Sequence, residues 1–136
     1  MLVIDANILI RAVLGSRVFF CSANMQARWN LWRVVFLEAR DHLPKILKRR
    51  DIPVAPAMAA LDALRLLVRT IESETYQCFE ALARQRIDPR DEDDWPVLAT
   101  ALALDCAIWT EDTDFFGCGV ATWTTDRVEL YLRKIS

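Results

Sequence analysis

The stretch from Asp91 to Phe116 constrains the fold most, because acidic residues lie on both sides of an apolar segment of helical length. Pro96 is tolerated in a first helical turn, and the apolar residues after it recur at helical spacing up to Leu104. The segment 107–110 then has the length and composition of a short buried strand. A helix followed by a strand indicates an α/β protein, in which sites form at the carboxyl ends of strands.

The acidic residues of this stretch are grouped at its two boundaries. Asp93 and Asp94 precede the predicted helix, where the helix dipole favours anions and a side chain can cap the first turn. The second group follows the predicted strand. The full set is Asp91, Glu92, Asp93, Asp94, Glu111, Asp112 and Asp114.

The N-terminus has a matching arrangement. Residues 2–4 form a short apolar run that ends at Asp5, and residues 8–14 continue as a helix that Gly15 can stop. If the two predicted strands are neighbours in a parallel sheet, Asp5, Asp94 and Asp112 converge. The alternative is that Asp5 only caps the first helix and the other carboxylates are solvated.

Length and composition predict one domain over residues 1–136, with 54% apolar residues and a net charge of −2. The chain has no apolar run of membrane-spanning length and no signal segment at its N-terminus. Its four cysteines are scattered and His42 is the single histidine, so the spacing favours reduced thiols over a zinc site. We therefore expect a cytoplasmic protein with no membrane association.

Between these regions the periodicity is weaker. Residues 16–36 have no clean period, and 29–32 is interpreted as a helix that runs into a strand at 34–36. We expect Pro44 to interrupt or restart the helix opened by Glu38. Further helices are expected after Pro56 and from Ser73. Strands are expected at 67–71 and 120–123, and a terminal helix is expected to be capped by Thr125 or Asp126. In the helix from Ser73, the side chains expected to face the core are Tyr76, Phe79, Leu82 and Ala83, and those expected to face solvent are Arg84 and Arg86.

Three motifs resemble those of a PIN domain, the fold of VapC-type toxin nucleases and related ribonucleases. The opening LVIDANILI resembles the first strand of the family with its first catalytic aspartate, Asp5. The segment 94–101, DWPVLATA, resembles the helix that begins with an aspartate and continues with apolar residues and alanine. The segment 109–115, WTEDTDF, resembles the strand end Thr-x-Asp-x-Asp-Phe. The motifs occur in the family's order and span most of the chain.

The resemblance implies a three-layer α/β/α sandwich around a parallel sheet of about five strands, in the order 3-2-1-4-5. It also implies cleavage of RNA that depends on Mg²⁺ or Mn²⁺, with Glu38 as the middle acid on the helix after the second strand. Two carboxylates about 4 Å apart repel by roughly 4 kcal/mol at an effective dielectric near 20. Converging carboxylates therefore need shared protons or a cation, and hard oxygen ligands select Mg²⁺ or Mn²⁺.

The expected mechanism is attack by a metal-activated water, since no side chain is placed as a nucleophile. The expected catalytic residues are Asp5, Glu38, Asp94 and Asp112, and the expected metal ligands are Asp5, Asp94, Asp112 and Asp114. Asp114 is equally well interpreted as a turn cap, and Asp91 and Asp93 as capping or solvated residues. Asn7 or Thr110 is a candidate to hold a ligating carboxylate through a hydrogen bond. Trp109, Trp123 and His42 are interpreted as structural or surface residues.

Phosphate binding requires cations near the acids. The candidates are Arg11, Arg40 and the group Lys45, Lys48, Arg49 and Arg50, although such a run also fits a solvated face. The candidate partners are RNA, an antitoxin protein and a second copy of the chain, with apolar residues among 19–36 as a candidate dimer interface. The main alternative function is a catalytically silent PIN domain that binds RNA or protein. A weaker alternative is phosphoryl transfer through Asp5.

Overall fold

A computed structural model describes residues 1–15 and 29–135, and it has a five-stranded sheet in the order β3-β2-β1-β4-β5. All four strand pairs are parallel, as expected for an α/β protein. The order is the one that the resemblance implied. The strands are β1 (Leu2–Ile4), β2 (Trp29–Trp32), β3 (Val68–Ile71), β4 (Ala107–Trp109) and β5 (Thr122–Trp123).

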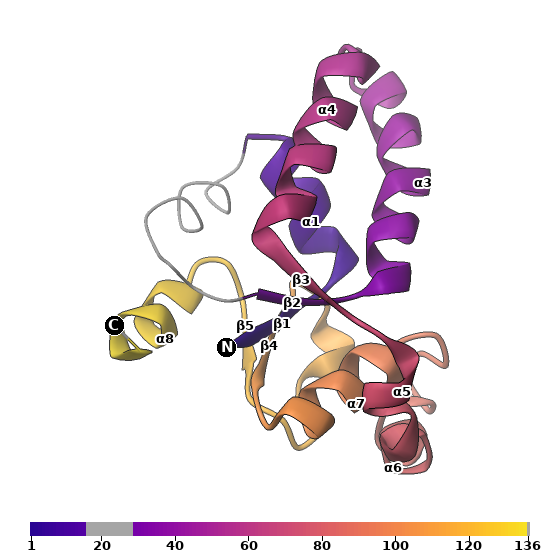
Figure 1. The fold of residues 1–136 in the computed structure, drawn as a ribbon, viewed down its shortest axis with the longest axis vertical. Helices are drawn as coiled ribbons and strands as arrows, with labels where there is room; N and C mark the ends of the chain where they lie inside the picture. The colour runs from indigo at the N-terminus through magenta and orange to yellow at the C-terminus, as the bar shows by residue number, and fades with distance from the viewer. Residues whose placement is uncertain (16–28, 136) are drawn as a thin grey trace.

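The helices cover both faces of the sheet. Figure 1 shows α1, α3 and α4 on one side of the strands, with α5, α6 and α7 on the other. Within the described ranges, no helix is long and apolar enough to cross a membrane. The helices are α1 (Ala6–Val13), α3 (Arg33–Arg49), α4 (Val54–Leu64), α5 (Ser73–Tyr76), α6 (Glu80–Ile87), α7 (Trp95–Leu104) and α8 (Val128–Ile135), with 3-10 turns η1 (Arg65–Leu67), η2 (Gln77–Phe79) and η3 (Thr113–Phe115).

The central strands β1 and β4 bring the two acidic regions together. Ile4 is in register with Trp109, and the Asp5 amide donates a hydrogen bond to the Trp109 carbonyl at 3.2 Å. Trp109 is fully buried, which confirms its interpretation as a core residue. Because both strands end at the same edge of the sheet, Asp5 and Thr110 leave it side by side.

The expected order of helix and strand around residue 32 was wrong. The strand β2 comes first, and α3 begins at Arg33 and carries Glu38 in its second turn. A buried stripe at helical spacing explains the helix: Val35, Phe36, Ala39, Leu43 and Leu47 are all at most 9% exposed. The candidate dimer interface among residues 19–36 lies mostly outside the described residues.

Pro44 does not interrupt α3, contrary to expectation. A proline inside a helix costs about 3 kcal/mol through its missing N–H and its ring. Leu43 and Leu47 are fully buried on either side of it. Burial of each leucine contributes about 1.5–3 kcal/mol, so the packing of this face offsets the cost.

The second expected helix from Ser73 is divided by the 3-10 turn η2. Tyr76 and Ala83 are buried as expected, but Leu82 is 38% exposed, so its inward placement was wrong. A 3-10 turn rotates about 120° per residue and an α-helix about 100°, so the helical phase that starts at Tyr76 does not reach Leu82.

Candidate metal centre

Asp5 is held rigidly at the carboxyl end of β1. Its Oδ1 accepts a hydrogen bond from the Ala6 amide at 2.6 Å, which caps α1. Its Oδ2 accepts from the Asn7 side-chain amide and from the Thr110 hydroxyl, both at 2.8 Å. The expectation that Asn7 or Thr110 holds a carboxylate is confirmed for both residues at Asp5.

The loop after β4 is tied to the same point. The Thr110 hydroxyl oxygen accepts a hydrogen bond from the Asp112 amide at 2.9 Å while its proton goes to Asp5. Asp112 Oδ1 in turn accepts from the Asp114 amide and caps η3. The turn cap is therefore Asp112, and the Asp114 carboxylate belongs to a separate acidic group.

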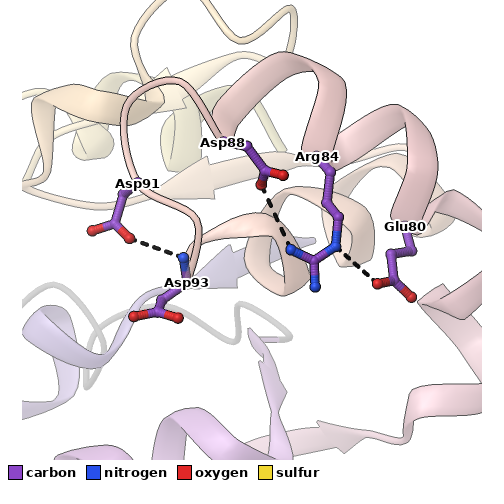
Figure 2. Close-up of polar contacts among 5 residues, drawn as sticks. All are labelled: Glu80, Arg84, Asp88, Asp91 and Asp93. Carbon is purple, nitrogen blue, oxygen red and sulfur yellow. Dashed lines mark hydrogen bonds and ion pairs between the residues drawn. The ribbon is translucent and has the colours of Figure 1, made fainter.

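That group consists of Asp91, Asp94 and Asp114. Each offers a carboxylate oxygen, and the three oxygens lie within 4.8 Å of one another. Asp91 also accepts a hydrogen bond from the Asp93 amide at 2.9 Å, which closes a turn in the connection and caps neither α6 nor α7 (Figure 2). The structure thus places three carboxylates, two from the connection between α6 and α7 and one from the loop after β4, close enough to share one cation.

Asp94 is the central member of this group. It occupies the position before α7, yet its side chain makes no capping hydrogen bond, so the expected cap was wrong. Its Oδ2 is buried with no hydrogen-bond partner among the described residues. A buried, unpartnered carboxylate oxygen is costly unless it is protonated or bound to a cation.

The electrostatics of Asp94 agree with this geometry. Burial raises its pKa to about 8, with further increases from the charges of Asp91, Asp5, Asp112 and Asp114. Without a cation, Asp94 therefore holds a proton at neutral pH. The neighbouring negative charges that add to this increase also attract a divalent ion.

The pKa values of Asp5 and Glu38 are also raised. Burial raises the pKa of Asp5, and the hydrogen bonds from Thr110, Ala6 and Asn7 oppose that increase. Partial burial raises the pKa of Glu38, followed by the negative charge of Asp5, while His42 lowers it. Glu38 lies on the helix after the second strand and interacts electrostatically with Asp5, as the resemblance implied.

These residues fit a hard divalent cation. All the ligand atoms of the group are carboxylate oxygens, which favour Mg²⁺ or Mn²⁺ over softer metals. A bound cation would give the orphaned Oδ2 of Asp94 a partner and relieve the repulsion among the acids. Asp5 and Asp112 lie outside the 4.8 Å group and act on Asp94 through their charges.

The segment that carries Asp91 is anchored to α6 by a polar network. Arg84 donates to Glu80 at 2.8 Å and lies 3.8 Å from Asp88 (Figure 2). The Arg84 guanidinium also lies 4.7 Å from the centre of the Trp95 ring, which joins α6 to the start of α7. Of these contacts, the one between Arg84 and Trp95 spans the connection between the two helices, and Asp91 and Asp94 both belong to that connection.

Two arginines join the same region to the loop after β4. Arg90 donates to the Asp114 carbonyl at 2.7 Å and also to the Phe116 carbonyl. Arg86, which we expected to face outward, donates to the Cys118 carbonyl at 3.2 Å. Gly117 has φ +84°, and a Cβ there would lie 3.4 Å from the Arg90 guanidinium. Arg90 therefore spans the gap between its neighbour Asp91 and the loop of Asp114.

We predict that Arg90→Ala lowers the Mn²⁺ affinity of the protein about tenfold, or about 1.4 kcal/mol. The loop that carries Asp114 loses the two hydrogen bonds that Arg90 donates to its carbonyls, while every carboxylate is retained. Titration of Mn²⁺ followed by electron paramagnetic resonance measures the effect. Arg127→Ala, an exposed arginine whose neighbour Asp126 is 3.7 Å away, is the matched control. An unchanged Mn²⁺ affinity in Arg90→Ala would contradict the positioning role.

The three expected RNA-binding cations lie in different surroundings. Arg11 is exposed on α1 and Lys48 is exposed near the end of α3. Arg40 forms an ion pair with Asp62 of α4 at 2.6 Å. Arg40 is two residues from Glu38, and two residues on an α-helix are about 200° apart. Arg40 therefore points away from the acidic group.

Sequence reasoning missed Asp91 as a group member and Arg90 as its anchor. The spacing of three residues between Asp91 and Asp94 was a weak signal, because it brings side chains together only when the turn between them is known. No sequence signal exists for Arg90, since its partners are backbone carbonyls on a distant loop.

The comparisons with known proteins agree with these features. A family model of the PIN domain matches residues 3–133. No curated protein matches the sequence. The matched range spans both acidic regions of the chain.

Proposed function

The chain belongs to the PIN domain family, and on this premise we propose that it is a Mg²⁺- or Mn²⁺-dependent ribonuclease that hydrolyses RNA phosphodiester bonds. The observation that carries the proposal is the buried, unpartnered Oδ2 of Asp94 among Asp91 and Asp114. PIN domains are generally nucleases. A carboxylate placed in this way can serve as a metal ligand, whereas without a cation its burial lowers the stability of the folded protein.

In this proposal Asp94, Asp91 and Asp114 hold the ion, and Asp5 and Asp112 supply further negative charge or complete the ligand set. When bound, the ion lowers the pKa of a water and neutralises charge that develops on the phosphate. Asp5 is suited to hold its charge at a fixed position, because three hydrogen bonds keep its carboxylate in one orientation.

Glu38 is proposed to accept the proton of the attacking water. Its pKa is raised by partial burial and by Asp5, so it is a stronger base than an ordinary glutamate while its exposed position leaves it accessible. The charge of His42 opposes this increase in the pKa of Glu38. No other side chain is required as a nucleophile.

For the RNA strand we propose a path along α3. His42, Lys45 and Arg49 follow Glu38 at intervals of four, three and four residues, so they lie on the same side of the helix as Glu38. All three are exposed. This side of α3 offers cations other than the expected Arg11 and Lys48, and it supports a phosphate path that leaves the acidic group along the helix.

We predict that Lys45→Ala with Arg49→Ala weakens binding of single-stranded RNA and reduces the slope of log affinity against log salt by about 1.4, or about 0.7 for each phosphate contact. Fluorescence anisotropy with labelled RNA at several salt concentrations measures both. Lys48→Ala with Arg50→Ala removes the same charge from other sides of the helix end and serves as the control. Equal effects of the two pairs would contradict a defined path.

The enzymatic proposal is tested by cleavage of a mixed pool of structured and single-stranded RNA with Mn²⁺ or with EDTA. We expect cleavage with Mn²⁺, none with EDTA, and a loss of about 100-fold or more in Asp94→Asn. Asp105→Asn makes the same change at the opposite, exposed end of α7 and is expected to retain activity. Mn²⁺ at about 100 times its Kd should stabilise the wild type by about 2.7 kcal/mol.

A folded wild type that neither cleaves RNA nor gains stability from Mn²⁺ would refute the enzyme and leave the silent binding module. The toxin role also stays a prediction. Growth arrest on expression of the wild type, but not of Asp94→Asn, would support that role, and equal growth would contradict it.

A further inference from the structure

A separate cavity of about 420 Å³ lies between the start of α3, the turn η1 and the edge strand β3. Phe36 and Arg40 line it, and each is two residues from Glu38 on α3. Residues two apart on a helix are about 200° apart, so the cavity is on the side of α3 that faces away from Glu38. Its other lining residues include Leu37, Arg65, Val68 and Thr70.

The strand beside this cavity has an open edge. Among the described strands, β3 pairs only with β2. An edge strand presents backbone N–H and C=O groups that can pair with another extended chain. Val68 and Thr70 line the cavity, and side chains alternate along a strand. A segment added to β3 would therefore direct every second side chain into the cavity.

Exposed leucines surround the same place. Leu66 is 87% exposed, Leu67 is 65% exposed and Leu37 is 50% exposed. Leu66 and Leu67 lead directly into β3, and Leu37 lines the cavity. Large apolar side chains grouped beside an open sheet edge are typical of an interaction surface.

The cavity also contains positive charge. The Arg65 guanidinium lies 5.7 Å from the centre of the Phe36 ring and pairs with no carboxylate among the described residues. Arg40 shares the cavity but is paired with Asp62 at 2.6 Å. Glu72 also lines the cavity and has an interaction of its own. A carboxylate entering the cavity would thus meet one guanidinium without an acidic partner, a second that is already paired, and one acidic residue that is already engaged.

We propose that the edge of β3 and this cavity bind an extended segment of a partner protein, with an apolar and an acidic side chain two residues apart. The segment pairs with the β3 backbone, its apolar side chain packs on Leu37 and Val68, and its carboxylate binds Arg65. Backbone pairing supplies affinity, and the cavity selects the side chains.

Two other occupants fit less well. A second copy of the chain offers the strand Val68–Ile71, whose one charged residue is Arg69, and the Glu72 that follows this strand already has an interaction within its own chain. An RNA strand could bind Arg65 through phosphate, but it would not pair with the β3 backbone or pack on Leu66 and Leu67. The acidic, apolar segment satisfies the charge, the leucines and the open edge together.

The test uses the full chain and fluorescein-labelled extended peptides in which threonine alternates with leucine and glutamate, so that leucine and glutamate share one face. We expect saturable binding in fluorescence polarisation and at least tenfold weaker binding to Arg65→Glu. A peptide with lysine in place of glutamate should bind Arg65→Glu better than it binds the wild type. Arg69→Glu reverses a charge on the face of β3 opposite Val68 and Thr70, which line the cavity, and should leave binding within about twofold.

Three results would overturn the proposal. The first is no saturable peptide binding by folded wild type, whose integrity is checked by circular dichroism. The second is equal loss of affinity in Arg65→Glu and Arg69→Glu, which would indicate only non-specific charge attraction. The third is a wild-type dimer in sedimentation analysis that Leu66→Asp converts to a monomer, which would assign the edge to a second copy.

Discussion

Replacing Asp94 by asparagine is expected to stabilise the metal-free protein at alkaline pH by about 2 kcal/mol. The pKa of Asp94 is raised from 3.8 in the unfolded chain to about 8 in the folded protein. The folded state therefore binds more protons, so stability is full below pH 3.8, falls as the pH rises and levels off above about 8. Because Asp94 is only half buried, solvent screening reduces the nominal penalty to about 2 kcal/mol.

Thermal unfolding at about pH 8.5 and about pH 5, in the presence of EDTA, measures this effect. We expect Asp94→Asn to melt about 8 °C above the wild type at the higher pH and close to it at the lower pH, where Asp94 is protonated. The control Asp105→Asn should show no such dependence on pH, and asparagine tolerates the left-handed backbone at φ +47° there. Destabilisation of Asp94→Asn at both values would show that its carboxylate has a structural partner.

Metal binding by the wild type is expected to strengthen about tenfold for each pH unit between about pH 6 and pH 8. The ion must displace the proton that Asp94 holds in this range, so one proton leaves for each ion bound. Above about pH 8 the carboxylate is already ionised, and the dependence should disappear. Metal affinity therefore rises with pH while the stability of the metal-free protein falls, because the negative charge that destabilises the metal-free site also attracts the ion.

Calorimetric titration of Mn²⁺ in two buffers of different ionisation enthalpy counts the released protons. We expect about one proton near pH 7 and few above pH 8. Asp105→Asn should release the same number as the wild type, while Asp94→Asn should release far fewer and bind Mn²⁺ weakly. An affinity that is constant from pH 6 to pH 8 would exclude Asp94 as a ligand that titrates in this range.

The local elements of the fold could largely be predicted from sequence. Residues 2–4 and 107–109 are strands, and Pro96 lies in the first turn of α7 as expected. These features depend on short-range rules, namely apolar periodicity and the backbone limits of proline. The same rules failed at Leu82, where a 3-10 turn shifted the helical phase, and at Pro44, where packing offset the local cost.

By itself, the sequence determined that Asp5 and the loop of Asp112 would leave the same edge of the sheet, because parallel strands bring their carboxyl ends to one edge and Asp5 and Thr110 directly follow neighbouring strands. Only the tertiary structure decided which carboxylates lie close enough to share an ion. Asp91 joins Asp94 and Asp114 because Arg90 binds the carbonyls of Asp114 and Phe116. Strand position follows from periodicity in the chain, whereas the approach of two loops depends on contacts to backbone atoms, which are the same for every residue type and leave no pattern in the sequence.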